Sequence, residues 1–431
     1  MLSCAQFPKA LFALAIIGTT ASSASAATLC VNHGGTAGCW STIGAAVAAA
    51  SPGDTITVAA STYNEDVHIT KSLSLVGDPF NPPTIDAAGK NNGIFVDGMA
   101  AAPLAGIANV TVYGFKVEHA NYEGILVANG FNVTISGNHV LNNNKALKPG
   151  ETACEGIPAF ETSEAMDCGE GVHLVSSNHS SLVRNLIEDN SGGILVTDET
   201  GPTSDNLIDG NIVHDNGYAC GITLASHPNG LTHALPYGIT HNTIANNQSY
   251  HNGLLLPGAG AGVGIFAPGP GNSNTANVVT GNTLWGNGLP GVTMHVHGYA
   301  PMAPPVSLND NIIIGNHIHG NAADTADAHT SGSTGINVYS AAPITGTVIA
   351  NNDFSDEAID ISFRAPAGSS LTAHFNDFDA STTGISNTGS GWIDATENWW
   401  NCASGPSASC ASTSGPNITT TPWLPFAYNS Y

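Results

Sequence analysis

One stretch of the sequence gathers side chains that can move protons. It begins at Gly193, ends at His227, and contains Asp198, Glu199 and Asp215. Carboxylates and imidazoles are common general acids and bases, and a plain repeat would hold Asn, Ser or Thr at such positions. We therefore predict a catalytic site in which Asp198 works with Glu199 or Asp215 as acid and base in hydrolysis of a glycan.

A second chemistry would use a histidine in place of the carboxylate pair. His227, or His173 earlier in the chain, would remove the proton beside a uronate carboxylate in a lyase reaction. That reaction also needs a cation to neutralise the carboxylate. The chain has 8 Lys and Arg against 32 Asp and Glu, so we expect the cation to be Ca²⁺ held by Asp and Glu oxygens.

The charge balance narrows the class of partner. The net charge is −24, and loss of an N-terminal export segment with its single Lys9 would leave 7 basic against 32 acidic residues, or −25. Nucleic-acid binders need basic surface to displace counterions, so this class is excluded, and an anionic membrane surface is disfavoured. A polyanion would also be repelled, which favours a neutral or weakly charged polysaccharide as the partner.

These residues belong to a repeat that recurs through most of the chain. One half reads Asn-x-φ-x-x-Asn, with φ apolar, and the other half is Gly followed by alternating apolar residues. The glycines Gly171, Gly193 and Gly221 are 22 and 28 residues apart. A period of about 20 to 30 residues with short strands is one turn of a parallel β-solenoid. We expect the recurring Asn to tolerate left-handed backbone at turns and to hydrogen-bond to the next Asn above it.

Aligning the coils on their glycines predicts which side chains are neighbours. Equivalent residues of adjacent coils stack about 4.8 Å apart. Six positions after the glycine, Glu199 and His227 fall on adjacent coils, with Asp198 beside Glu199 and His173 one coil below. The stretch from Gly193 to His227 is therefore predicted to form one site on the outside of the sheet.

The same alignment gives a second set of residues. His295 points outward from a strand, and His297 and Arg364 occupy the column of Glu199 in later coils. Arg364 would lie about five coils, or about 24 Å, from Glu199, and about two coils from His297. We predict that His295, His297 and Arg364 bind substrate outside the first site.

Both ends of the solenoid have a cover. Ser41 to Ala50 predicts a short amphipathic helix, and Trp399, Trp400 and Trp423 gather near the C-terminal end. Together with residues 53–77 (GDTITVAASTYNEDVHITKSLSLVG) and 397–406 (ENWWNCASGP), the Asn-rich coils resemble the right-handed parallel β-helix proteins of the pectin-lyase-like superfamily. Among these the chain is most similar to the NosD-like type with PbH1 repeats, over about residues 28 to 428.

The resemblance implies an all-β, single-domain solenoid. We expect a signal peptide at 1–26, an N-terminal cap and first strand at 27–60, parallel β-helix coils at 61–390 and a C-terminal cap at 391–431. Lys9, the apolar run Ala10 to Gly18 and the Ala24-Ser25-Ala26 cleavage site predict a secreted or periplasmic chain without a membrane-inserted segment.

The mature chain would have seven cysteines. Export makes oxidation plausible, and local pairing predicts three disulfides. The pairs are Cys30 with Cys39, Cys154 with Cys168, and Cys402 with Cys410. Cys220 is left over, and we interpret it as a buried, inert thiol.

The fold hosts lyases, hydrolases, esterases, epimerases and adhesins, so the resemblance predicts the fold more strongly than the activity. The pectin methylesterase and polygalacturonase motif sets are absent, and Arg364-Ala-Pro is only part of the pectate-lyase pattern. Our first hypothesis is a monomeric polysaccharide lyase or glycoside hydrolase. The alternatives are a non-catalytic glycan-binding or cell-surface β-helix protein, and a NosD-like periplasmic maturation factor.

Overall fold

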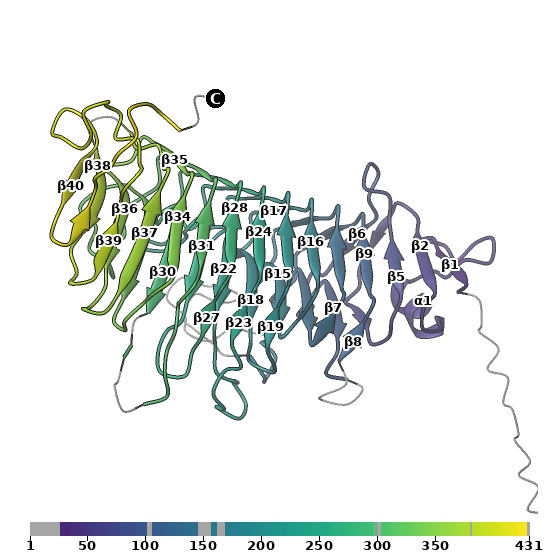
Figure 1. The fold of residues 1–431 in the computed structure, drawn as a ribbon. Helices are drawn as coiled ribbons and strands as arrows, with labels where there is room; N and C mark the ends of the chain where they lie inside the picture. The colour runs from purple at the N-terminus through teal and green to yellow at the C-terminus, as the bar shows by residue number, and fades with distance from the viewer. Residues whose placement is uncertain are drawn as a thin grey trace, which may run out of the picture.

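The computed structural model describes residues 26–100, 106–144, 157–161, 169–296, 298–299, 303–379 and 382–428. In these residues a long stack of short strands winds around one apolar core, with a single helix near the N-terminal end (Figure 1). The strand pairs of the stack are parallel, and nearly all follow the order of the coils. The predicted all-β, parallel β-helix fold is confirmed.

Three long sheets form the walls of the coils in the described part of the chain. Sheet A has 14 strands: β1 Thr28–Val31, β2 Thr55–Val58, β5 Ser74–Val76, β9 Thr111–Tyr113, β13 Thr134–Ser136, β16 Ser181–Val183, β20 Leu207–Asp209, β24 Thr243–Ala245, β28 Val278–Thr280, β31 Ile312–Ile314, β34 Thr347–Ala350, β37 Ser370–His374, β39 Trp392–Asp394 and β41 Ile418–Thr419.

Sheet B has 10 strands within the same described ranges: β3 Thr62–Tyr63, β6 Thr84–Asp86, β10 Lys116–Glu118, β14 His139–Leu141, β17 Leu186–Glu188, β21 Ile212–His214, β25 Gln248–Tyr250, β29 Thr283–Trp285, β32 His317–His319 and β35 Asp353–Ser355.

Sheet C carries most of the chemistry-bearing side chains. Its 12 strands in the described residues are β4 Val67–Ile69, β7 Ile94–Asp97, β11 Ile125–Ala128, β15 Glu170–Val175, β18 Gly192–Thr197, β22 Ile222–Ala225, β26 Val263–Phe266, β30 Val292–Val296, β33 Thr334–Ser340, β36 Ile359–Arg364, β38 Thr383–Asn387 and β40 Ser412–Ser414. Short pairings add β8 Ile107–Ala108 with β12 Gly130–Phe131, and β19 Thr203–Ser204, β23 Ile239–Thr240 and β27 Asn274–Thr275.

The two sequence motifs map onto these sheets. The Asn-x-φ-x-x-Asn unit occurs twice in one coil, because residues 206–216 (NLIDGNIVHDN) contain β20 of sheet A and β21 of sheet B. The glycine-led motif forms the sheet C strands. A Cβ at Gly193 would lie 2.1 Å from the carbonyl oxygen of Gly221, so glycine recurs where adjacent coils come closest.

Asparagine ladders join the coils at the corners. At each rung, the side-chain oxygen of one Asn accepts hydrogen bonds from the backbone N and Nδ2 of the Asn one coil earlier, as between Asn282 and Asn247 at 2.8 and 2.9 Å. One ladder runs after sheet B through Asn143, Asn190, Asn216, Asn252, Asn287, Asn321 and Glu357. The predicted bonding between stacked asparagines is confirmed.

Left-handed backbone falls on the residue before the ladder position. Asp189, Asp215 and Asn246 have φ of 55°, 54° and 55°, and each precedes a ladder asparagine. The expectation that the recurring asparagine itself has a positive φ is therefore wrong at these corners. The residue with positive φ turns the chain at the corner. The side-chain amide of the following asparagine then points along the solenoid axis and bonds to the next coil.

The ends are built as expected. Helix α1 (Ile43–Ala49) covers the first coil, and both carboxylate oxygens of Glu65 accept hydrogen bonds from the backbone N–H groups of Ile43 and Gly44 at its N-terminus. Trp400 is fully buried against Phe378 at the other end. No helix in the described residues has the length and apolar character needed to span a bilayer.

Two of the three expected disulfides are present, Cys30–Cys39 and Cys402–Cys410. Cys154 and Cys168 lie outside the described residues, as does the predicted signal segment up to residue 25. Cys220 is buried, and its Sγ accepts a hydrogen bond from the backbone N of Ala261 at 3.2 Å.

Candidate functional site

The outward face of sheet C is covered in the middle of the solenoid. Segment 157–161 lies over it through Phe160, which packs against Leu126, Ala128 and Val175. A second segment, 228–238, meets the first, since the backbone N of Gly230 donates to the carbonyl of Phe160 at 3.0 Å. The side chains that we expected on the outside of the sheet are therefore buried, because insertions between the coils fold back over the strands.

Glu199 and His227 lie on adjacent coils, as the register predicted. The carboxylate oxygen Oε1 of Glu199 is 3.4 Å from Nδ1 of His227. Both side chains are almost fully buried, with relative exposures of 1% and 2%. Residues of the covering segment also contact this pair's backbone, since Nδ2 of Asn229 donates to the carbonyl of Glu199 at 3.0 Å.

Asp198 fastens the covering segment. Its carboxylate accepts hydrogen bonds from the backbone N of His227 at 2.8 Å, from the Ser226 hydroxyl at 3.1 Å and from the backbone N of Gly238. Burial raises the pKa of Asp198 to about 6, although the two backbone donors oppose the rise. Both oxygens accept hydrogen bonds from residues 226–238, so we interpret Asp198 as a residue that holds this segment in place.

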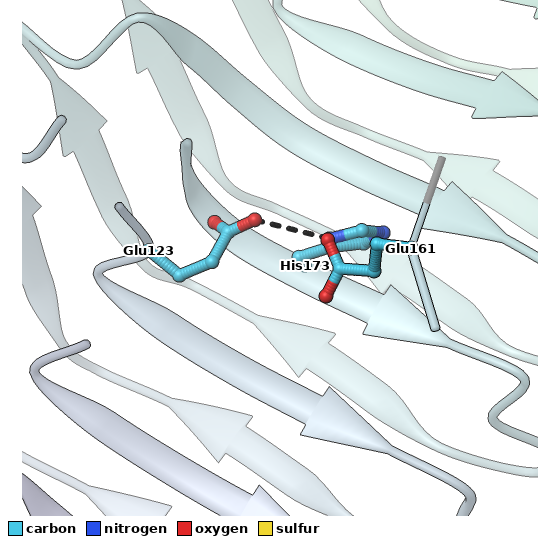
Figure 2. Close-up of side chains that lie close together, drawn as sticks. All are labelled: Glu123, Glu161 and His173. Atoms are coloured by element: carbon cyan, nitrogen blue, oxygen red, sulfur yellow. Dashed lines mark hydrogen bonds and ion pairs between the residues drawn. The ribbon is translucent and has the colours of Figure 1, made fainter. Parts of the chain in front are cut away.

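His173 is the centre of a buried group that also contains two glutamates. Its Nδ1 lies 3.0 Å from Oε1 of Glu123 and 3.5 Å from Oε2 of Glu161 (Figure 2). Its Nε2 lies 2.9 Å from the hydroxyl of Thr197. We call Glu123, Glu161 and His173 the His173 cluster. Glu199 lies near enough to interact electrostatically with both Glu161 and His173.

Burial and charge act against each other in this region. Burial raises the pKa of Glu123 to about 7, against the lowering effect of the His173 hydrogen bond, and burial also raises the pKa of Glu161. The pKa of His173 lies well above its usual value, because the two carboxylates outweigh burial. For Glu199, the neighbouring histidines outweigh burial and lower the pKa.

Sequence reasoning missed Glu123 and Glu161. Glu123 had a usable signal, because acidic residues precede the repeat glycine in two successive coils, at Glu123-Gly124 and Glu170-Gly171. Glu161 comes from an insertion without periodicity, so no register could place it.

A second constellation lies at β30, β33 and β36, four to six strands beyond β15 in sheet C. We call it the His295 cluster; its members are His295, Asp324, Asp327, Asn337, Tyr339 and Arg364. Oδ2 of Asp324 lies 2.9 Å from both Nε2 of His295 and Nδ2 of Asn337. Nδ2 of Asn337 also lies 3.0 Å from Nε2 of His295. In the tautomer in which Nε2 donates to Asp324, Nδ1 is the nitrogen left to accept a proton.

The surroundings fix this imidazole. The rings of Phe266 and Tyr339, on the adjacent coils, meet it edge-on with centroids 5.7 Å away on each side. The pKa of Asp324 is lowered, because hydrogen bonds from His295 and from backbone N–H groups outweigh burial. Asp324 therefore stays a carboxylate and keeps His295 oriented, in the manner of the aspartate of a catalytic triad.

On its open side, the His295 cluster contains the cationic side chain of Arg364 and the half-exposed carboxylate of Asp327. Register pairs His295 with Tyr339 and Tyr339 with Arg364 on β30, β33 and β36. The guanidinium carbon of Arg364 lies 5.6 Å from the centre of the Tyr339 ring. Asp327, whose side chain is 43% exposed, has Oδ2 3.7 Å from Nδ1 of His295. Arg364 and Asp327 are therefore members of the His295 cluster that reach the solvent-exposed surface.

The remaining predicted residues fall elsewhere. Asp215 directly follows β21 of sheet B, pairs with His214 at 2.7 Å, and lines a polar pocket of about 270 Å³ with Asp189 and Tyr218. Its position is that of a corner residue before ladder Asn216, and no contact among the described residues joins it to Glu199. His297 lies outside the described residues. The structure thus brings His295 and Arg364 into one cluster and leaves Asp215 apart.

Comparison with known proteins supports the fold. Residues 84–235 match the family described as right-handed β-helix region. Three solved structures are similar: ORF18 of Geobacillus virus E2 (11% identity, 81% of this chain and 57% of that one, TM-score 0.50), the catalytic domain of a GH87 alpha-1,3-glucanase in complex with tetrasaccharides (13%, 85% and 63%, TM-score 0.50), and pectate lyase Pel9A (12%, 94% and 82%, TM-score 0.49).

The chain spans less than two thirds of the length of the virus protein and of the glucanase domain. None of the curated proteins matches it in sequence. At such low identities the likeness is one of fold alone.

Proposed function

We propose, from the premise that this chain is a right-handed parallel β-helix, that it is a carbohydrate-active protein whose reacting groups belong to the His295 cluster. The observation that carries the proposal is the imidazole of His295, which is itself 2% exposed. It is held by the buried carboxylate of Asp324 at 2.9 Å and lies 3.7 Å from Asp327, whose side chain is 43% exposed. An oriented base (His295) beside a cation (Arg364) and a phenol hydroxyl (Tyr339) can remove a proton from the carbon next to a carboxylate.

The reaction class that fits these groups best is β-elimination from a uronate-containing glycan. The proton on the carbon beside the uronate carboxylate moves to Nδ1 of His295, and Arg364 neutralises the carboxylate while negative charge develops there. The glycosidic C–O bond breaks, a C=C bond forms, and the leaving oxygen takes a proton from the hydroxyl of Tyr339. Each step uses a group within the cluster.

This proposal changes the expected substrate class. The net charge of −24 favoured a neutral or weakly charged glycan. Arg364 is, however, one of only two arginines in the chain, and it is half-buried on the face that also holds His295. A half-buried guanidinium can bind a planar carboxylate through two hydrogen bonds, and distant surface charges beyond the screening length act on it only weakly.

Hydrolysis fits the cluster less well. A glycosidase needs two carboxylates, each able to act on the substrate. Asp327 meets that need, but Asp324 is committed to His295, to Asn337 and to the backbone N of Asp327. The carboxylates Asp198 and Glu199 are buried, and we assign Glu199, His227 and His173 to the interior of the covered region.

A panel of glycans tests the proposal. We expect the purified protein to act on polyuronates, giving products with the ultraviolet absorbance of an unsaturated uronate end, and to leave neutral glycans intact. New reducing ends without that absorbance would favour a hydrolase instead. Binding without any product would favour the non-catalytic alternative and contradict the proposal.

A further inference from the structure

The His173 cluster has a feature that the proposed reaction does not use. Glu123, Glu161 and His173 come from three separate parts of the chain: the corner before β11, the inserted segment 157–161, and β15. Their relative exposures are 0%, 5% and 1%. Figure 2 shows the carboxyl groups of both glutamates directed toward the same edge of the imidazole.

The spacing of their ligand atoms suits a small cation. One nitrogen or oxygen from each residue lies within 4.8 Å of the others, and the two contacts of His173 Nδ1 are 3.0 and 3.5 Å. Around a tetrahedral ion with bonds of about 2.0 to 2.1 Å, neighbouring ligand atoms are about 3.3 Å apart. The cluster is thus near the size of such a coordination shell.

Outer hydrogen bonds orient each group. Nε2 of His173 contacts the hydroxyl of Thr197 at 2.9 Å, so when Nε2 donates there, Nδ1 can present its lone pair to an ion held between it and the glutamates. The second oxygen of Glu123 accepts from the backbone N of Glu170 at 2.9 Å, and the hydroxyl of Tyr122 donates to Glu161. Fixed tautomers and tethered carboxylates are typical of the surroundings of bound metal ions.

Two buried oxygen atoms give an independent indication. Oε1 of Glu161 and Oε2 of Glu199 are buried and accept no hydrogen bond within the described residues. Both belong to glutamates that interact electrostatically with His173. Buried carboxylate oxygens without donors are costly unless a cation compensates them, and four glutamates (Glu123, Glu161, Glu170 and Glu199) outnumber the two histidines here.

We propose that Glu123, Glu161 and His173 bind a divalent transition-metal ion, for which Zn²⁺ is the best fit. An imidazole nitrogen with two carboxylates suits Zn²⁺, whereas Ca²⁺ prefers six to eight oxygen ligands. The ion joins the inserted segment to sheet C, since Glu161 is the sole ligand from that segment. Its role is to hold the cover over β11, β15 and β18, at a distance from the His295 cluster.

Metal analysis of the full chain tests this. After removal of metal with a chelator and dialysis, Zn²⁺ added back should bind with one equivalent per chain and raise the melting temperature, because an ion that binds only the folded state stabilises it. Glu161→Gln should weaken Zn²⁺ binding by more than about 100-fold, since changes outside the ligand shell alone cost up to that much.

Two variants serve as controls. Glu188→Gln alters a more exposed carboxylate that contacts His139 at 2.7 Å, and it should bind Zn²⁺ as the unchanged chain does. His295→Gln should also keep the site, which separates this proposal from the proposed reaction. The proposal is overturned if Zn²⁺ neither binds nor raises the melting temperature of the unchanged chain, or if Zn²⁺ binding requires His295 and not Glu161.

Discussion

Replacing His295 with glutamine is expected to lower the rate of polyuronate cleavage by about 10³-fold, within the range that a positioned general base contributes. Glutamine keeps a donor for Asp324 but has no basic nitrogen in place of Nδ1. The buried contact with Asp324 at 2.9 Å can therefore survive while proton abstraction is lost. Initial rates, measured by the absorbance of the unsaturated product, give the result.

His317→Gln is the matched control. His317 forms a similar histidine–aspartate pair, with Nδ1 2.9 Å from Oδ2 of Asp353, but that pair is exposed on sheet B. This variant should keep the full rate. If His295→Gln retains full activity with an unchanged melting temperature, His295 is not the base and the assignment of the site fails.

Replacing Glu357 with glutamine is expected to stabilise the protein above neutral pH. Glu357 occupies the position of an asparagine in the ladder after sheet B, where its Oε1 accepts from the backbone N and Nδ2 of Asn321 at 2.9 and 3.0 Å. Burial raises the pKa of Glu357 from 4.5 to about 7. The ionised carboxylate is thus disfavoured in the fold, and glutamine keeps the acceptor without the charge.

The sign of the pH dependence follows from the raised pKa. Between about pH 4.5 and 7 the folded chain holds a proton that the unfolded chain has lost, so stability falls as pH rises through this window. The loss is complete above the folded-state pKa and amounts to about 3 kcal/mol. Glu357→Gln should therefore raise the free energy of unfolding by up to that amount at about pH 8, and by little at about pH 4.

Denaturant unfolding at both pH values measures the difference. Glu118→Gln, which alters a carboxylate paired with Lys116 on sheet B, should show a much smaller change between the two conditions. Equal effects of Glu357→Gln at both pH values would mean that Glu357 ionises normally in the fold.

The sequence alone predicted the fold, because every coil of a solenoid repeats the same strand and corner pattern. The spacing of Gly171, Gly193 and Gly221 placed three successive strands of sheet C, and the register then made Glu199 and His227 neighbours. The same pattern separated Arg364 from Glu199 by several coils, but it placed Arg364 in the wrong column. The register pairs His295 with Tyr339 and Tyr339 with Arg364, so Arg364 lies in the column of His295 and not in that of Glu199 and His297.

The coil register alone could not predict the burial of the first site, because this burial depends on insertions. Segments 157–161 and 228–238 break the period, so their course over sheet C is not encoded in any register. Asp198 was interpreted as an acid for catalysis, yet it is needed to accept backbone hydrogen bonds from 226–238. Asp324 and Asp327 were missed for a related reason, since they lie in the irregular segment between β32 and β33.

The most direct test of the central claim is a crystal structure of the His295→Gln variant with a bound oligouronate. The account predicts that the glycan lies against sheet C at β30, β33 and β36, with one carboxylate within hydrogen-bonding distance of the Arg364 guanidinium. A glycan bound elsewhere, such as the pocket beside Asp189 and Asp215, with no carboxylate near Arg364, would contradict it.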